Sequence, residues 1–201
     1  MTDAPESPDS PDSGPTSAQA LFGARMEEAL FKARRIFVFG EITQALAKDV
    51  VQKLVALADD SEDDISIWIN SQGGHVEAGD TIFDVIRFVG PRVKLLGTGW
   101  VASAGAHIYL SVPREDRYSL PNTRYMLHQP MGGVRGQASD IGIEAEEIVK
   151  MRRRLNQVIS DQTGQPLDKV DKDTDRNFWM SAEEAKAYGI VGRIVSNSSE
   201  V

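Results

Sequence analysis

Two segments of the chain carry residue types suited to nucleophilic catalysis. Ser103 lies among alanines and glycines in residues 97–106. Small neighbours let other chain segments or a substrate approach its backbone closely. His128 lies in residues 126–133, and a loop histidine titrates near neutrality, as proton transfer requires. The pair predicts a nucleophile and a general base, although each residue alone is a weak signal, because small-residue runs usually mark tight helix packing.

The other two histidines suggest a metal site as an alternative. His75 follows Gly74, and His107 lies in the segment after Ser103. No tight ligand spacing supports a metal, so we expect none. We interpret His107 as a packed helix residue and His75 as a neighbour of the substrate cleft. The sequence has no glycine-lysine loop for phosphate, and we expect no cofactor.

Composition restricts the class of protein. With 201 residues, 41% of them apolar, the chain is long enough for one full-sized core. Its net charge of -8 argues against nucleic acid as a partner. The absence of cysteine excludes disulfides and fits a reducing compartment. No apolar run approaches the roughly 18 residues that cross a bilayer, and no secretory signal begins the chain, so we expect a cytoplasmic protein without membrane partners.

The chain begins with a segment of different composition. Residues 1–19 are rich in proline, serine and aspartate, which predicts a disordered acidic tail before a domain at residues 20–201. An amphipathic segment at residues 22–34 leads into a β-rich run, residues 36–39, which we expect Gly40 to close. Thr43 is the expected cap of the next helix.

Strand and helix patterns alternate through the rest of the chain. Strand-like runs occur at residues 36–39, 65–69, 93–96, 118–120, 125–127 and 191–195. Helical apolar spacing follows several of them, as in residues 78–89, where Ile82, Val85, Ile86 and Val89 share a face. This alternation predicts an α/β fold with right-handed crossovers and mostly parallel strands.

One predicted helix is longer than a small domain needs. Residues 137–162 contain no proline and keep an apolar stripe, and at about 1.5 Å per residue the helix would approach 40 Å. Gly164 should end it, so we expect the helix to protrude and pack against a neighbour. Ser181 and Glu184 form a capping-box pattern that starts a later helix.

Several motifs together resemble the ClpP family, the proteolytic subunits of caseinolytic (Clp) proteases. They are Asn70-Ser71-Gln72-Gly73-Gly74, Ala102-Ser103-Ala104-Gly105, Leu120-Pro121-Asn122-Thr123-Arg124, His128-Gln129-Pro130 and Gly136-Gln137-Ala138-Ser139-Asp140. The resemblance covers roughly residues 35–195. It implies an α/β crotonase-like spiral of ββα units with a long protruding handle helix.

The same resemblance implies a function. The chain would be a serine endopeptidase subunit whose seven-membered rings stack as a tetradecamer. It would hydrolyse peptides and unfolded proteins delivered by an AAA+ unfoldase such as ClpX or ClpA. Ser103 would be the nucleophile and His128 the base, with the backbone N–H groups of Gly74 and Ala104 as the oxyanion hole. Without the resemblance, an ordinary strand-to-helix turn is the favoured interpretation of Gly73-Gly74.

The third catalytic position departs from the family pattern. In residues 174–181 the aspartate of the family is replaced by Asn177. A neutral amide cannot stabilise an imidazolium as a carboxylate does. Two hypotheses stay open: a slow or assembly-dependent enzyme, and a weakly active subunit that co-assembles with a second ClpP paralogue. Asp171, Asp173 and Asp175 are near enough in sequence to replace the missing carboxylate.

Further residues concern assembly and partners. Asp175 and Arg176 match a charged pair that links ring to ring in the family, although isolated surface charges would look the same. Trp68 and Phe88 are candidates for an unfoldase docking pocket, or are buried under the helices beside them. Two other functional classes compete with the protease: a non-hydrolytic crotonase-fold enzyme acting on acyl-CoA thioesters, and a purely structural ring subunit.

Overall fold

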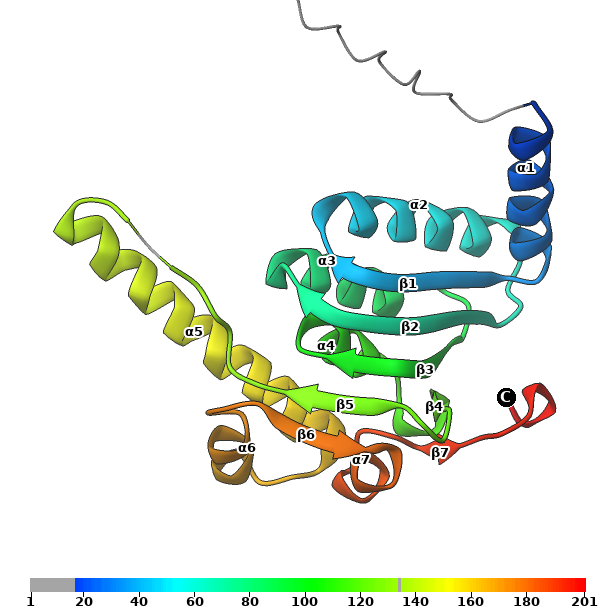
Figure 1. The fold of residues 1–201 in the computed structure, drawn as a ribbon. Coiled ribbons are helices and arrows are strands. Elements are labelled where there is room, and N and C mark those ends of the chain that lie inside the picture. The colour runs from blue at the N-terminus through cyan, green and yellow to red at the C-terminus, as the bar shows by residue number, and fades with distance from the viewer. Residues whose placement is uncertain (1–16, 134) are drawn as a thin grey trace, which may run out of the picture. The chain divides into compact units, whose positions relative to one another are not determined.

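A mostly parallel sheet organises the chain (Figure 1). Five strands pair in parallel in the order β1-β2-β3-β4-β7: β1 (Arg35–Ile42), β2 (Ile65–Gly74), β3 (Val93–Ala102), β4 (Arg117–Ser119) and β7 (Arg193–Ile194). A short strand, β5 (Arg124–Leu127), pairs in parallel with the far end of β3, and β6 (Phe178–Ser181) pairs antiparallel with β5. The predicted α/β class with a predominantly parallel sheet is therefore confirmed.

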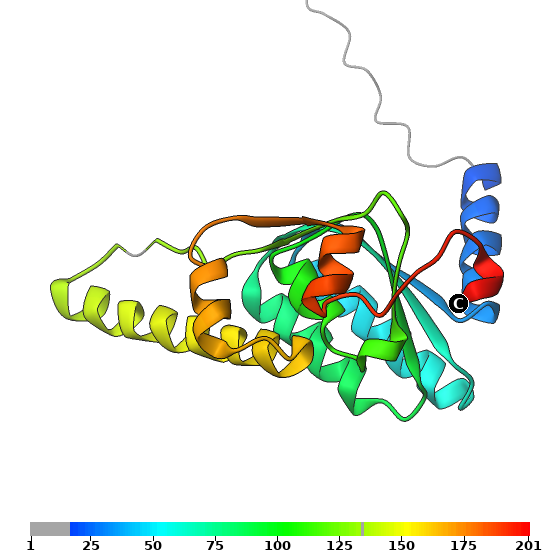
Figure 2. The ribbon, with the colours of Figure 1, turned by 90° about the horizontal axis from the view of Figure 1, so that it is seen from below.

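Helices connect the strands. They are α1 (Ser17–Lys32), α2 (Gln44–Asp60), α3 (Val76–Phe88), α4 (Ala104–Tyr109), α5 (Ala138–Thr163), α6 (Leu167–Asp173) and α7 (Ala182–Tyr188), with short 3₁₀ turns at Arg114–Asp116 and Ser198–Glu200. Figure 2 shows α2, α3 and α4 on the same side of the sheet. Among the residues described, no helix combines the length and apolarity that a membrane span needs.

This computed structural model describes residues 17–133 and 135–201. These residues fall into two units that divide between Ala33 and Arg34. The first unit contains α1, in which Lys32 and Glu28 form an ion pair of 2.7 Å. Most of the tail predicted at residues 1–19 lies outside the described residues, and α1 begins at Ser17, within that range. The second unit contains the sheet and the residues of the candidate site.

The core lies between the sheet and its helices, because the apolar residues of the strands and those of the helices each fall on a single face. In β2, Ile65, Ile67 and Ile69 alternate with half-buried residues and are fully buried. In α2, Val50 and Leu54 recur at helical spacing and are also fully buried. A strand period of two and a helix period of 3.6 thus present one apolar face each, and burying both faces is the main stabilisation of this unit.

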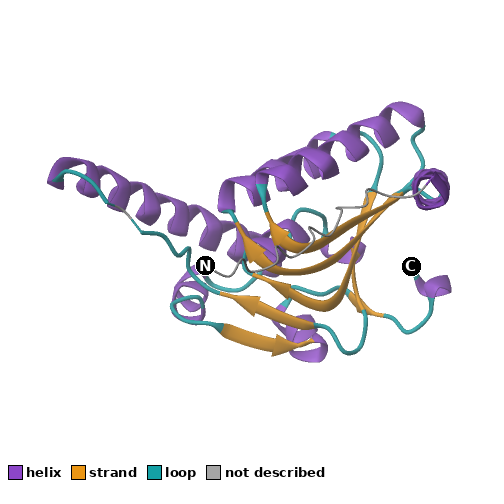
Figure 3. Cartoon of the chain, turned by 45° about the horizontal axis from the view of Figure 1, so that its top comes forward, coloured by secondary structure: helices purple, strands orange, loops and turns teal. Residues whose placement is uncertain are grey.

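Helix α5 extends beyond the end of the sheet (Figure 3). Its buried residues are Asn156 and Ile159, both in its C-terminal half, while Ile141, Ile143 and Val149 are exposed. Gly164 ends the helix in the left-handed conformation with φ of 74°, as predicted. The predicted protrusion is confirmed; the expected neighbour stays a prediction.

Local capping was predicted correctly at two helices. The Thr43 hydroxyl accepts from the Leu46 amide at the start of α2, and Ser181 with Glu184 forms the capping box of α7. The predicted end of the first strand at Gly40 is wrong. β1 continues to Ile42, because Gly40, with φ of 80°, sits at a bulge where the register with β2 shifts.

Candidate active site

Ser103 occupies the junction between β3 and α4. Its φ of 54° is positive, which is uncommon for any residue with a side chain. Such a conformation costs about 1–3 kcal/mol and persists only where the surroundings enforce it. Here the Ser103 amide donates to the Met126 carbonyl at 2.9 Å, and the helix begins at the next residue. The sharp strand-to-helix turn presents the hydroxyl at the end of the sheet.

His128 follows β5, the strand that pairs with the end of β3. Its Nε2 lies 2.7 Å from Ser103 Oγ, so the two residues singled out from the sequence share a hydrogen bond. The imidazole is half-buried. Burial lowers the pKa of His128 below its ordinary value of 6.5, and a hydrogen bond with the Asn177 side chain partly opposes that shift. The ring is therefore neutral at pH 7 and ready to accept the serine proton.

The position of Asn177 is set by strand register. Strands β5 and β6 are antiparallel, and their last pair is Leu127 with Phe178. The next residues outward from that pair are His128 and Asn177, which explains why the Asn177 side chain reaches the imidazole. Asn177 is exposed and carries no charge.

The glycines at the end of β2 lie against the serine. A Cβ on Gly73 would lie 2.5 Å from Ser103 Cβ, and Gly73 has a φ of 101°. Gly74 is exposed with a φ of 155°, and a Cβ there would collide with the Ile42 carbonyl oxygen. Ala104 is the first residue of α4, where amide groups have no partner within the helix. Of the two predicted oxyanion-hole residues, Ala104 follows Ser103 directly in the chain, and Gly74 follows Gly73, the glycine that lies against Ser103.

A pocket opens beside the hydroxyl. It is lined by Val76, Ser103, Ala104, His107, Leu127, His128, Pro130, Leu155 and Ile159. Most of these side chains are apolar, and Leu155 and Ile159 come from α5. A pocket that contains both the nucleophile and the base is suited to hold the group next to the bond that reacts.

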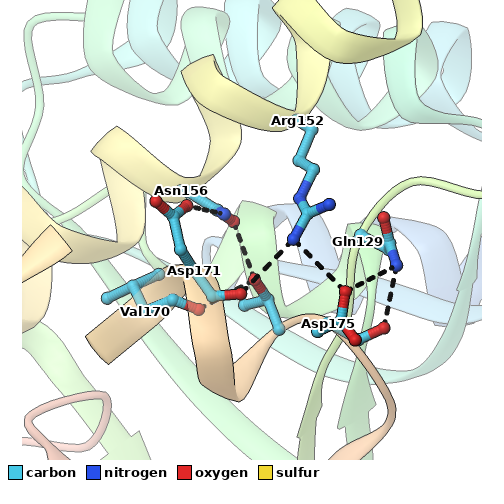
Figure 4. Close-up of polar contacts among 7 residues, drawn as sticks. Gln129, Arg152, Asn156, Val170, Asp171 and Asp175 are labelled. Atoms are coloured by element: carbon cyan, nitrogen blue, oxygen red, sulfur yellow. Dashed lines mark hydrogen bonds and ion pairs between the residues drawn. The ribbon is translucent and has the colours of Figure 1, made fainter. Parts of the chain in front are cut away.

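A polar network holds the segment before Asn177 (Figure 4). The Asn156 amide of α5 donates to Asp171 at 2.6 Å, and the Thr174 hydroxyl lies 3.2 Å from Asn156 Oδ1. Both Asn156 and Thr174 are buried. The backbone N–H of Gln129 donates to the backbone carbonyl of Thr174 at 2.6 Å. The residue after His128 is therefore tied to the segment that leads to Asn177.

The charged residues near Asn177 have partners other than His128. Arg152 of α5 lies 3.5 Å from Asp175, whose carbonyl also accepts from the Gln129 side chain at 2.8 Å. Asp171 accepts from Asn156, and Asp173 accepts from the Tyr188 hydroxyl at 2.8 Å. None of these three aspartates hydrogen-bonds to His128 in the described structure. Arg176 is exposed and has no ion pair there.

The three histidines do not come together. His75 Nδ1 lies 3.1 Å from Glu77, and His107 Nε2 lies 2.9 Å from Asp80. In the described part of the chain, no group of three or more histidines and carboxylates could hold a metal ion. His107 is buried and stacks on Phe83, as a packed helix residue should, but it also lines the pocket.

Several residues of the site had no role assigned to them from the sequence, although some of them lie within its motifs. Gly73 supports Ser103, and Gln129 and Thr174 join the two catalytic segments. The glycine pair after a strand was a usable signal for Gly73, since adjacent glycines often mark a close backbone approach. Nothing local distinguishes Thr174 or Asn156, because their roles depend on distant partners.

The geometry is that of an acyl-transfer site. A serine hydroxyl that is hydrogen-bonded to a neutral imidazole can attack a carbonyl while the hydroxyl proton moves to Nε2 of the ring. The imidazole can then return that proton to the leaving group.

Comparison with known proteins gives a consistent result. The model of the Clp protease family matches residues 20–198. ATP-dependent Clp protease proteolytic subunit 3 of Rhizobium meliloti (strain 1021) is 60% identical over 179 residues, which are 89% of this chain and 92% of that protein. Proteolytic subunit 2 of Gluconobacter oxydans (strain 621H) is 52% identical over 201 residues, covering 99% and 89% of the two chains.

Two solved structures resemble this chain in both fold and sequence. ClpP1 from Listeria monocytogenes is 53% identical, with a TM-score of 0.80 over 87% of this chain and 98% of that chain. An asparagine-to-aspartate mutant of the same ClpP1 has 53% identity, the same coverage and a TM-score of 0.82.

We expect Gly73→Ala to disable the serine without unfolding the sheet. The new Cβ would collide with Ser103 Cβ and strain a positive φ, displacing the hydroxyl from His128. A displacement of about 1 Å should slow labelling of Ser103 by a fluorophosphonate about 100-fold. Gly23→Ala, where no atom lies within 4 Å of the new Cβ, is the control. Equal labelling rates for the two variants would contradict the assigned packing.

Proposed function

Because this chain belongs to the Clp protease family, we propose that Ser103 and His128 are the nucleophile and general base with which it cleaves peptide bonds. It is a Clp-type serine endopeptidase subunit, with the fold of ClpP. The observation that carries the residue assignment is the hydrogen bond of 2.7 Å between Ser103 Oγ and His128 Nε2. The protease domain is proposed to span residues 20–201.

The proposed mechanism has two stages. Ser103 Oγ attacks the scissile carbonyl as its proton passes to His128 Nε2, and the resulting imidazolium protonates the leaving amine. Water then hydrolyses the acyl-enzyme with the same histidine as base. The N–H groups of Gly74 and Ala104 are proposed to bind the oxyanion, an interaction worth about 3–4 kcal/mol in related hydrolases.

Asn177 is proposed to orient the imidazole without stabilising its charge. Its hydrogen bond with His128 supports an orienting role, as in cysteine proteases that use asparagine in this position. The pKa of His128 is nevertheless lowered, since burial outweighs that hydrogen bond. We therefore propose an active but slow enzyme. A weakly active or structural subunit that co-assembles with a second ClpP paralogue is the alternative.

Assembly into stacked seven-membered rings is the proposed quaternary state. Two features support it: α5 extends past the sheet with Ile141, Ile143 and Val149 exposed, and Arg176 has no ion pair in the described structure. Asp175 keeps Arg152 of its own chain as a partner. Arg176 is therefore the member of the predicted charged pair that is available to another subunit.

An AAA+ unfoldase such as ClpX or ClpA is the proposed partner. The relatives are named as subunits of an ATP-dependent protease, so nucleotide hydrolysis would belong to the partner. Exposed aromatic residues offer a docking surface. The rings of Phe37 and Trp68 are tilted by 51° with centroids 5.8 Å apart, and Trp68 packs on the buried cluster of Leu96 and Tyr118. Phe88 is 86% exposed, so the alternative that it is buried is wrong. The cytoplasmic location stays a prediction.

The assigned function is tested with the purified full-length chain. We expect it to hydrolyse a short fluorogenic peptide and to be labelled by a fluorophosphonate at Ser103. Ser103→Ala should abolish labelling and lower kcat by about 10³ or more. Labelling elsewhere, or turnover of an acyl-CoA thioester without peptide hydrolysis, would favour the thioester enzyme instead.

Asn177→Asp should raise kcat for the same peptide. A carboxylate stabilises the imidazolium that forms in the transition state, and the reverse exchange costs about 10⁴ in a serine protease, which sets the upper bound. We expect at least a tenfold gain in steady-state assays. Asn122→Asp, the same change of charge at an exposed turn, is the control.

The Asn177→Asp variant should also shift the pH profile of kcat/KM. Activity requires neutral His128, so kcat/KM falls as the pH drops through the pKa of that residue. In the wild type this acid limb should lie below pH 6.5, because burial lowers the pKa of His128. A carboxylate at position 177 favours the imidazolium and should shift the limb to higher pH. An unmoved limb together with unchanged kcat would exclude Asn177 from the site.

Arg176→Ala is expected to weaken contact between rings. Loss of the charge should shift the assembly from double to single rings and reduce peptidase activity severalfold, as measured by light scattering and peptide hydrolysis in parallel. Lys48→Ala, which removes an exposed charge from α2, is the control. Intact double rings in the Arg176 variant would refute the proposed role.

A further inference from the structure

A buried polar group lies beside the nucleophile. His107 is in the first turn of α4, and its amide donates to the Ser103 carbonyl at 3.0 Å. Its side chain is 8% exposed and lies almost parallel to the Phe83 ring, with centroids 4.5 Å apart. His107 also lines the pocket that contains Ser103 and His128. The pocket next to the reacting bond is thus not entirely apolar.

Two charged residues fix the orientation of this histidine. His107 Nε2 lies 2.9 Å from Asp80 Oδ1, and Arg154 of α5 donates to both Asp80 oxygens at 2.8 and 2.6 Å. Burial raises the pKa of Asp80, but the hydrogen bonds from His107 and Arg154 outweigh burial and lower it to about 2. Asp80 is therefore ionised, and its carboxylate can act only as a hydrogen-bond acceptor.

The other ring nitrogen is left without a partner. An ionised carboxylate at Nε2 selects the tautomer with its proton on that atom, so Nδ1 of the neutral ring is an acceptor. Both ring nitrogens of His107 are buried without a hydrogen bond of good geometry among the described residues; Nε2 still has its close contact with Asp80, whereas Nδ1 has no polar contact there. Buried polar atoms in native proteins are nearly always satisfied. An occupant of the pocket can supply the missing donor.

We propose that His107 determines specificity at the P1 position, the substrate residue on the amino side of the cleaved bond. Its Nδ1 selects a P1 side chain that joins an apolar stem to a neutral hydrogen-bond donor, as in glutamine and asparagine. The stem contacts the apolar wall formed by Val76, Leu127 and Leu155. Charged donors are disfavoured because Asp80 is already paired with Arg154. This inference rests on the proposed peptidase function.

The test compares side chains of matched size. Four fluorogenic peptides differ only at P1, as glutamine against methionine and asparagine against leucine, and kcat/KM is measured for the full chain at pH 8. The wild type should prefer the amide in each pair. His107→Phe keeps an aromatic ring against Phe83 but removes both nitrogens. It should lower each preference about tenfold, the effect of one neutral hydrogen bond of about 1.4 kcal/mol.

Two further variants separate hydrogen bonding from shape. The amide oxygen of asparagine is as many bonds from Cβ as Nδ1 is, so His107→Asn should retain most of the preference. The amide of glutamine instead matches Nε2, so His107→Gln should lose it as His107→Phe does. Equal ratios in all three variants, or a wild type that prefers methionine and leucine tenfold, would overturn the proposal. The second outcome needs no folded variant.

A binding measurement distinguishes failure of this inference from failure of the proposed function. The same peptides are titrated by fluorescence anisotropy against Ser103→Ala and against the double variant with His107→Phe. A glutamine preference that disappears in the double variant supports the pocket even if the wild type cleaves nothing, which would refute only the peptidase assignment. Cleavage by the wild type with unchanged P1 ratios in His107→Phe would refute only the role of His107.

Discussion

The hydrogen bond between Ser103 and His128 is the interaction on which the site depends. It requires Ser103 to be held at positive φ, and it requires the His128 imidazole to be buried enough that its lowered pKa keeps the ring neutral. Neither condition is local. The backbone of Ser103 is held by β5 through the Met126 carbonyl, and the imidazole of His128 is placed by the same strand, which pairs with the end of β3. The catalytic pair is thus a product of sheet pairing, and the strain at Ser103 is sustained by it.

Much of the fold follows from local rules, and the exceptions have a physical cause. Thr43 and Ser181 cap their helices because a side chain within three residues satisfies a free amide. Gly40 does not end its strand, because a bulge depends on the partner strand, which no local pattern reveals. The mostly parallel order of strands follows from the alternation of strands and helices, whereas the antiparallel β5–β6 pair does not.

The residues of the site likewise divide into those that local motifs identify and those that depend on distant partners. Ser103, His128 and Asn177 were found through motifs, yet only the fold explains their proximity. His107 was interpreted correctly as a packed residue, but its contacts with Asp80 and Arg154 join three helices that are distant in sequence. The role of a buried polar side chain depends on which partners surround it, and a single sequence does not contain that information.

The antiparallel register of β5 and β6 has an evolutionary consequence. His128 and Asn177 meet because their strands pair, so the length of chain that joins those strands does not enter into their distance. The outer half of α5 belongs to that connection and has no buried residue, whereas Asn156 and Thr174 anchor the inner half. Insertions and deletions at the outer tip therefore leave the distance between His128 and Asn177 unchanged, and this part of the helix can diverge among paralogues in the contacts it makes with other subunits while the catalytic geometry is inherited.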